Sequence, residues 1–155
     1  MEENEYYPDG HMEKVAEDSQ ISRNYIKFIN CYGKESFKRF NLHLLEDDTI
    51  IYAIGNMYII ENIMTNEKKI FFGKDTSGIG SIAVHPNKWF FAVAEKGNMP
   101  NIYIYDYKDN NRLYRILRKG TEVSYAHISF SKSGSKLASV GQGPDFTLTI
   151  WDWMS

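Results

Sequence analysis

Residues 81–107 read SIAVHPNKWFFAVAEKGNMPNIYIYDY, and residues 127–153 read HISFSKSGSKLASVGQGPDFTLTIWDW. The two segments align without a gap at an offset of 46 residues, with identities at Ile82/Ile128, Ala92/Ala138, Gly97/Gly143, Ile104/Ile150 and Asp106/Asp152. The preceding residues repeat the pattern at an offset of 40, which changes to 44 after the short Gly55-Asn56 turn. A repeat of this length with four strands is typical of a β-propeller blade. The sequence therefore predicts an all-β fold of about three four-stranded blades, fewer than the usual minimum of four for a closed ring.

Short runs of β-branched and aromatic residues, separated by Gly, Asn, Asp, Pro and Ser, predict the positions of the strands. The expected strands are 42–45, 49–54, 57–63 and 69–72, then 80–85, 89–94, 102–107 and 113–117, then 126–131, 136–140 and 147–153. In 102–107 aliphatic and aromatic residues alternate, which indicates a sheet covered on both faces by neighbouring blades. In an open ring the last strand is instead expected to leave Leu148, Ile150 and Trp151 exposed.

The first forty residues differ from the rest of the chain. Residues 1–20 hold seven acidic residues and one Lys without a hydrophobic period, which predicts a flexible acidic arm. Apolar residues at helical spacing from Ile21 predict a short helix and linker over 21–39, so that 40–155 forms the partial propeller. Cys31 is the single cysteine, and no apolar run is long enough for a secretion signal or a membrane span. The expected location is therefore the cytoplasm, without a membrane partner.

Two stretches of the third unit carry a family resemblance. Residues 130–139, FSKSGSKLAS, and 147–152, TLTIWD, resemble the WD-repeat consensus, and the second unit is a weaker copy. The Gly-His pair that usually precedes such a repeat is missing. Asp145 occupies the position of the family's turn aspartate without its usual His partner, so the family's hydrogen-bonded tetrad is expected to be incomplete.

Longer strings include NLHLL (41–45), TIIYAIGN (49–56), AVAEKG (92–97) and LASVG (137–141). Together they resemble the N-terminal propeller of the family of cilia- and flagella-associated protein 44, and the likeness extends from about Tyr25 to Trp153. This resemblance implies a non-enzymatic structural scaffold of the ciliary or flagellar axoneme. It further implies a role in the tether that holds inner-arm dynein motor heads near the doublet microtubule, and so in normal ciliary beating. The implied partners are the related protein 43 of the same series and inner-arm dynein, with tubulin as a further candidate. The alternative is a soluble WD-repeat adaptor outside cilia, working in vesicle traffic or ubiquitin ligation, because fold alone does not fix function.

Several patterns with possible chemistry have simpler explanations. Gly78-x-Gly80-x-x-Ala83 resembles a dinucleotide fingerprint, but the residues that follow alternate like a strand where a helix is needed. The four histidines and Cys31 show no metal-ligand spacing, and the acidic run 46–48 fits a turn. The basic clusters 34–39 and 112–119 are interrupted by apolar residues, which argues against a nucleic-acid partner. The sequence thus predicts no catalytic residues, no cofactor and no metal.

Loop length points to candidate binding residues. The second and third strands of a unit are joined by 95–101 in the second unit and by 142–146 in the third, whereas Gly55-Asn56 suffices in the first. Long exposed loops are where binding residues concentrate. The candidate partner-binding residues are Glu95, Lys96, Asn98, Gln142 and Asp145.

Overall fold

The computed structural model describes residues 33, 40–75 and 77–155, and these form eleven β-strands. The acidic arm expected over 1–20 and the helix expected over 21–39 lie outside the described residues, apart from the isolated Gly33. The strands are β1 (Leu42–Glu46), β2 (Thr49–Ile54), β3 (Met57–Asn62), β4 (Lys68–Phe72), β5 (Ile79–Val84), β6 (Phe90–Glu95), β7 (Ile102–Asp106), β8 (Arg112–Leu117), β9 (Tyr125–Phe130), β10 (Leu137–Gly141) and β11 (Leu148–Trp151).

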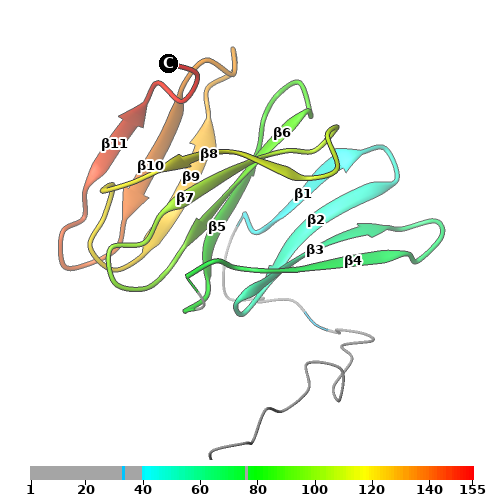
Figure 1. Ribbon diagram of the computed structural model, residues 1–155, viewed down its shortest axis with the longest axis horizontal. Coiled ribbons are helices and arrows are strands. Elements are labelled where there is room, and N and C mark those ends of the chain that lie inside the picture. Colours follow the sequence, from blue (N-terminus) through cyan, green and yellow to red (C-terminus); the bar gives the residue numbers. More distant parts are fainter. Residues whose placement is uncertain (1–32, 34–39, 76) are drawn as a thin grey trace, which may run out of the picture. The chain divides into compact units, whose positions relative to one another are not determined.

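The strands form three antiparallel sheets in which neighbours in sequence are neighbours in space (Figure 1). The first sheet has the order β1-β2-β3-β4, the second β5-β6-β7-β8, and the third β9-β10-β11. The described part of the chain contains no helix. The predicted all-β fold is confirmed, and every predicted strand ends within two residues of the observed one. Three sheets of this kind correspond to three blades, so the expected incomplete ring also holds for the described residues.

The first strands of the three sheets lie side by side, with β5 in contact with both β1 and β9. The Ile128 amide of β9 donates a hydrogen bond to the Ser81 hydroxyl of β5 at 3.2 Å. The two strands approach so closely at Gly80 that a Cβ there would lie 2.5 Å from the carbonyl oxygen of Tyr125. Glycine is therefore required at this position, and the sheets radiate from these strands as blades do.

Two apolar cores fill the spaces between the sheets. The first lies between sheets one and two, and its buried members are Leu45, Ile51, Ala53, Tyr58, Ile60, Ile79, Ile82, Phe91, Val93, Tyr103 and Tyr105. The second lies between sheets two and three, and its buried members are Ala83, Ala92, Ala94, Ile102, Ile104, Leu117, Tyr125, Ile128, Leu137 and Trp153. The aromatic face of β7 thus belongs to the first core and its aliphatic face to the second. This confirms that the alternation in 102–107 reports a sheet covered on both faces.

An aromatic cluster surrounds Trp153, which follows β11 and is fully buried. Its indole NH donates to the Gly134 carbonyl at 2.7 Å. Its ring lies 5.3 to 6.0 Å from the rings of His85, Phe90, Phe130 and Tyr114. Because three of these four rings follow or belong to strands of the second sheet, Trp153 joins the second and third sheets.

The third sheet has one covered face and one open face. Leu148 and Ile150 of β11 are 66% and 62% exposed, as expected for a ring that stays open. Trp151 departs from that expectation, since it is half-buried and its indole NH donates to the Ser139 hydroxyl at 2.8 Å. Trp151 points toward the second sheet's side of the blade, opposite to Leu148 and Ile150, because side chains alternate along a strand.

Candidate interaction surface

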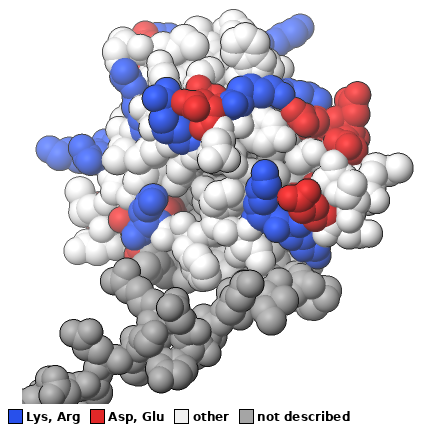
Figure 2. Space-filling view, turned by 45° about the vertical axis from the view of Figure 1, so that its right-hand side comes forward, with Lys and Arg blue, Asp and Glu red and all other residues white. Residues whose placement is uncertain are grey.

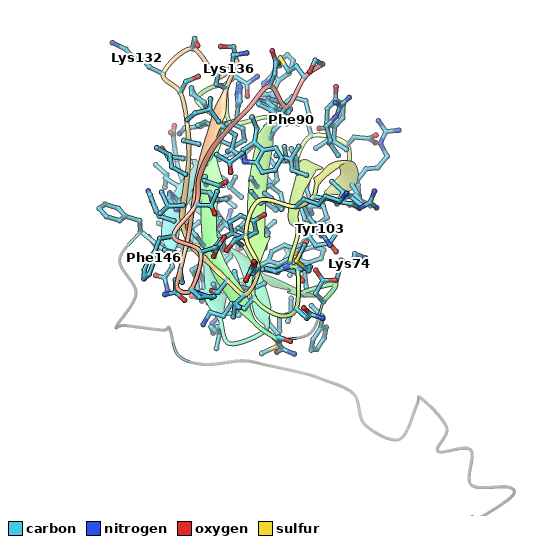
Figure 3. The ribbon with its side chains drawn as sticks, turned by 90° about the vertical axis from the view of Figure 1, so that its left-hand side faces the viewer. Lys74, Phe90, Tyr103, Lys132, Lys136 and Phe146 are labelled. Carbon is cyan, nitrogen blue, oxygen red and sulfur yellow. The ribbon has the colours of Figure 1, made fainter. Side chains whose placement is uncertain are left out.

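The two long loops named by the sequence lie at the same end of their sheets. One joins β6 to β7 over residues 96–101, and the other joins β10 to β11 over residues 142–147. In Figure 3 Phe146 and Tyr103 lie toward one end of the sheets, while Lys132 and Lys136 of the β9–β10 turn lie at the opposite end. We call the loops and linkers at the Phe146 end the loop surface. Its described residues are 55–56, 73–75, 77–78, 96–101, 118–124 and 142–147.

The linker between β8 and β9 holds the two loops together. The Gly97 amide donates to the Val123 carbonyl at 2.8 Å, and the Met99 amide donates to the Glu122 carbonyl at 2.8 Å. From the other side, the Gln142 amide donates to the Ser124 carbonyl at 2.7 Å. The structure therefore brings the predicted residues Lys96, Asn98 and Gln142 onto one continuous loop surface, although they belong to different sheets.

Glu95 does not fit the prediction of an exposed loop residue. It lies in β6 and is 1% exposed. Its carboxylate accepts hydrogen bonds from the Lys74 and Asp75 amides at 2.7 and 2.6 Å. Burial raises the pKa of Glu95, and the two backbone hydrogen bonds oppose that shift. Glu95 therefore anchors the linker between β4 and β5 and is not presented to solvent.

A second carboxylate, Asp75, anchors the same linker to the β6–β7 loop. Its two carboxylate oxygens accept hydrogen bonds from the Asn101 amide group and from the Tyr103 hydroxyl, both at 3.2 Å. Sequence reasoning missed Asp75, although the 46-residue offset places it opposite Thr121 (75 + 46 = 121). The repeat offset could have identified Asp75, because Thr121 likewise joins its linker to the following loop in the next unit.

Thr121 and Asp145 form the corresponding link in the third sheet. The Thr121 hydroxyl donates to one Asp145 carboxylate oxygen at 2.9 Å, and the Thr147 hydroxyl donates to the other at 2.7 Å. These bonds, the one from Thr147 first, lower the pKa of Asp145. The donors to Asp145 are therefore Thr121 on the linker and Thr147 in its own loop. Asp145 thus stabilises the loop and is half-buried.

The side chains left exposed on the loop surface are both polar and apolar. Asn98 and Gln142 are exposed, and Lys96 is partly exposed. Met99 and Val123 are about half exposed, and Phe146 is 73% exposed. Phe146 lies at the edge of the molecule in Figure 3. Loop length pointed to the polar members, whereas the apolar members were missed because a single exposed apolar residue carries no sequence pattern.

A hollow of about 510 Å³ opens on the loop surface beside Lys96. Its other lining residues are Gly33, Ile54, Gly55, Asn56, Ser77 and Gly78. The wall is held by main-chain bonds, since the Ile79 amide donates to the Gly55 carbonyl and the Gly73 amide to the Asn56 carbonyl, each at 2.8 Å. The hollow is therefore formed by backbone of the first hairpin and the next linker, with Lys96 as its charged side chain.

The described residues contain no group of three or more His, Cys, Asp or Glu side chains placed to hold a metal ion. Gly78 directly precedes β5 and Gly80 lies within it, so the segment is a strand, as the sequence indicated. No helix that could cross a membrane occurs in the part of the chain that the structure describes. Figure 2 shows Lys and Arg side chains lying among Asp and Glu side chains on the face in view.

Comparison with known proteins finds cilia- and flagella-associated proteins among the relatives of this chain. Cilia- and flagella-associated protein 44 of mouse is 40% identical over 139 residues, which cover 90% of this chain and 8% of that protein. The protein of the same name in Chlamydomonas reinhardtii is 35% identical over 142 residues, 87% of this chain and 8% of its own. Mouse cilia- and flagella-associated protein 43 is 31% identical over 120 residues, 77% of this chain and 7% of its own. The chain is homologous to cilia- and flagella-associated proteins 44 and 43.

No protein-family model matches the chain. The chain spans less than a tenth of the length of the cilia- and flagella-associated proteins that it matches. The aligned 139 residues with mouse protein 44 are more than the 115 residues, 36 and 79, of the described segments 40–75 and 77–155. The homology therefore extends beyond the three sheets into residues that precede them.

Proposed function

We propose that the chain is part of a non-enzymatic structural scaffold of the ciliary or flagellar axoneme, and that its three sheets are WD-repeat blades. In this role it contributes to the tether that holds inner-arm dynein motor heads near the doublet microtubule, and so to normal ciliary beating. The observation that carries the proposal is the homology with protein 44, at 40% identity over 90% of the chain. Homology with protein 43 points to the same cellular structure.

The loop surface supports a binding role. Asp75, Glu95 and Asp145 are carboxylates of the loops and linkers, and each is engaged with the protein's own backbone or side chains. These bonds fix the loops before any partner arrives, which lowers the entropy lost on binding. The exposed Met99 and Phe146 beside polar Asn98 and Gln142 give the mixture of apolar and polar groups that protein interfaces use.

The proposed partners are cilia- and flagella-associated protein 43 and inner-arm dynein, with tubulin as a further candidate. The loop surface, including Lys96, Asn98, Gln142 and the Asp145 loop, is the proposed docking face. A rigid blade with preformed loops suits this task, because a tether must hold its partner at a fixed place while the motor moves. We propose no cofactor or metal for it.

The test of location uses the full-length protein with a fluorescent tag, expressed in cells that lack the native copy. Axonemes are isolated and extracted with detergent. We expect the tagged protein to remain with the axoneme, and loss of the protein to change the beat while cilia still assemble. Release of the protein with the detergent-soluble fraction would contradict the axonemal role and favour the soluble adaptor outside cilia.

The test of the docking face compares two charge insertions at opposite ends of the sheets. Phe146→Glu changes an exposed side chain on the loop surface, and Ser133→Glu changes an exposed side chain on the β9–β10 turn at the other end. Neither removes a buried side chain, so both proteins should fold. Phe146→Glu should reduce cross-linking to dynein or protein 43 and fail to restore the beat, whereas Ser133→Glu should restore it. Full rescue by both variants would exclude Phe146 from the docking face.

A further inference from the structure

The outer edges of the first two sheets differ in charge. β4 and β8 are the outermost strands, and each pairs with one neighbour only. Residues 112–119, which comprise β8 and the two residues after it, contain four basic residues and no acidic one. β4 contains Lys68 and Lys69, and Lys68 is paired with Glu61 at 3.4 Å. Over the same span of the strand and its two following residues, 68–74, the β4 edge holds three basic residues and no acidic one, so the larger excess of positive charge lies at the β8 edge.

The unpaired charges lie at the end of β8. Arg112 is paired with Asp109 in the preceding turn at 2.7 Å, and the Arg115 guanidinium donates to the Ser155 carbonyl. Arg118 and Lys119 are exposed and form no ion pair with the residues that the structure describes. Two adjacent cations that directly follow the apolar end of β8 favour an anionic neighbour, because adjacent like charges repel each other.

The backbone of β8 is open beside these cations. An edge strand turns half of its backbone N–H and C=O groups away from its sheet, where another extended chain can pair with them. The register with β7 slips between Ile104 and Tyr105, but it is regular from Arg115 to Leu117. The regular half of the strand is thus the half next to Arg118 and Lys119. Exposed Leu113 and Tyr114 add apolar surface at the other end.

The charge selects the kind of chain that can pair with this edge. A second copy of β8 would bring its own basic residues against Arg118 and Lys119, which opposes pairing between copies. An acidic segment would instead supply carboxylates to both cations while its main chain completes the ladder, as in other cases of strand addition. We propose that the β8 edge binds an extended, acidic segment of a partner protein. This site adjoins the loop surface, because Arg118 and Lys119 begin the linker between β8 and β9, and it goes beyond the proposed function.

The test uses the purified chain and a ten-residue peptide of alternating Glu and Thr, because Thr favours the extended conformation. The matched peptide has Gln in place of every Glu. We expect the Glu peptide to bind at least tenfold more tightly, to weaken as salt rises, and to slow hydrogen exchange at amides of β8. Equal binding of the two peptides, or protection confined to β4 or β11, would overturn the proposal.

Two controls separate strand addition from general attraction to positive charge. Arg118→Gln with Lys119→Gln should weaken binding about fivefold or more, whereas Lys88→Gln with Lys132→Gln, the same change of charge elsewhere, should leave it unchanged. A Glu peptide N-methylated at alternate residues cannot donate the ladder hydrogen bonds, and it should lose most of its binding to the unchanged chain. If the methylated peptide bound as tightly as the unmethylated one, strand addition would be overturned, even if the Arg118 and Lys119 substitutions weakened binding. Because the assay contains no axonemal component, its outcome is independent of the proposed function.

Discussion

Trp153→Ala should be among the most destabilising single substitutions in the described part of the chain, and it should cost more than Trp151→Ala. Trp153 is fully buried, contacts rings of both neighbouring sheets and donates to the Gly134 carbonyl. Trp151 is only half-buried and donates to the Ser139 hydroxyl. The comparison therefore tests the packing of the two Trp side chains directly.

The magnitude follows from burial. A Trp side chain buries roughly 150 to 250 Å², which at about 25 cal/mol per Å² corresponds to roughly 4 to 6 kcal/mol as an upper estimate. Large-to-small truncation of a buried aromatic costs about 3 to 5 kcal/mol. The Gly134 carbonyl keeps a second partner, the His85 ring nitrogen at 3.2 Å, so loss of the indole donor adds little. We expect about 4 kcal/mol for Trp153→Ala and about 2 kcal/mol for the half-buried Trp151.

The assay is urea unfolding followed by far-ultraviolet circular dichroism, with free energies extrapolated to water. Because small domains are stable by only about 5 to 15 kcal/mol, Trp153→Ala could fail to fold. Trp153→Phe keeps a ring but leaves part of the buried indole volume unfilled, so it should fold and lose about 1 to 2 kcal/mol. If Trp151→Ala proved as costly as Trp153→Ala, or if Trp153→Phe had no effect, the assigned packing of the aromatic cluster would be wrong.

Three further substitutions have defined outcomes. Gly134→Ala should lower the melting temperature far more than Gly55→Ala. Both residues have positive φ, but a Cβ at Gly134 would overlap the His85 ring, whereas the space at Gly55 is open. Equal decreases in melting temperature would contradict this. Burial raises the pKa of Glu95, so its contribution to stability is complete below the unfolded pKa and falls as the pH rises through the raised folded pKa. The stability difference between the unchanged chain and Glu95→Gln, measured by urea unfolding from about pH 4 to about pH 8, should therefore narrow with rising pH, and a widening difference would reverse the assigned sign. Ile150→Lys places a charge on the exposed face of β11 and should reduce self-association in size-exclusion chromatography without lowering the unfolding midpoint, whereas a lower midpoint would mean that the face is covered.

Strand positions could be predicted because each depends on local pattern. The 46-residue offset aligned β5, β6 and β7 with β9, β10 and β11, and the observed strands agree within two residues. Glu95 was misplaced because the register of β5 and β6 slips between Ile79 and Ser81, which pairs Ile79 with Glu95 and extends β6 by one residue. A bulge of this kind leaves no mark on a hydrophobic period.

The loop surface could be predicted only in part, because it depends on contacts between units. Loop length identified Asn98 and Gln142, but no local pattern indicated that Val123 and Ser124 would accept the bonds that join their loops. Asp75 and Thr121 share a position in the repeat and differ in chemistry: one accepts hydrogen bonds and the other donates one. A search for identical residues misses such a pair. The two residues differ in type, and what the two units share is a hydrogen bond from the linker to the following loop.

The third sheet explains how far alternation in a sequence predicts burial. In β7 the residues of both faces are buried, because the second sheet has a neighbour on each side. In β11 Leu148 and Ile150 continue the aliphatic face of the repeat, but they are exposed, because no described residues pack against them. The two strands have nearly the same pattern and different surroundings. The pattern therefore specifies a blade that can be covered on both faces, and which face is covered depends on the presence of a neighbour. A substitution at Ile150 therefore tests whether another surface covers this face of β11. The equivalent substitution at Ile104 tests the packing of the buried core between the second and third sheets.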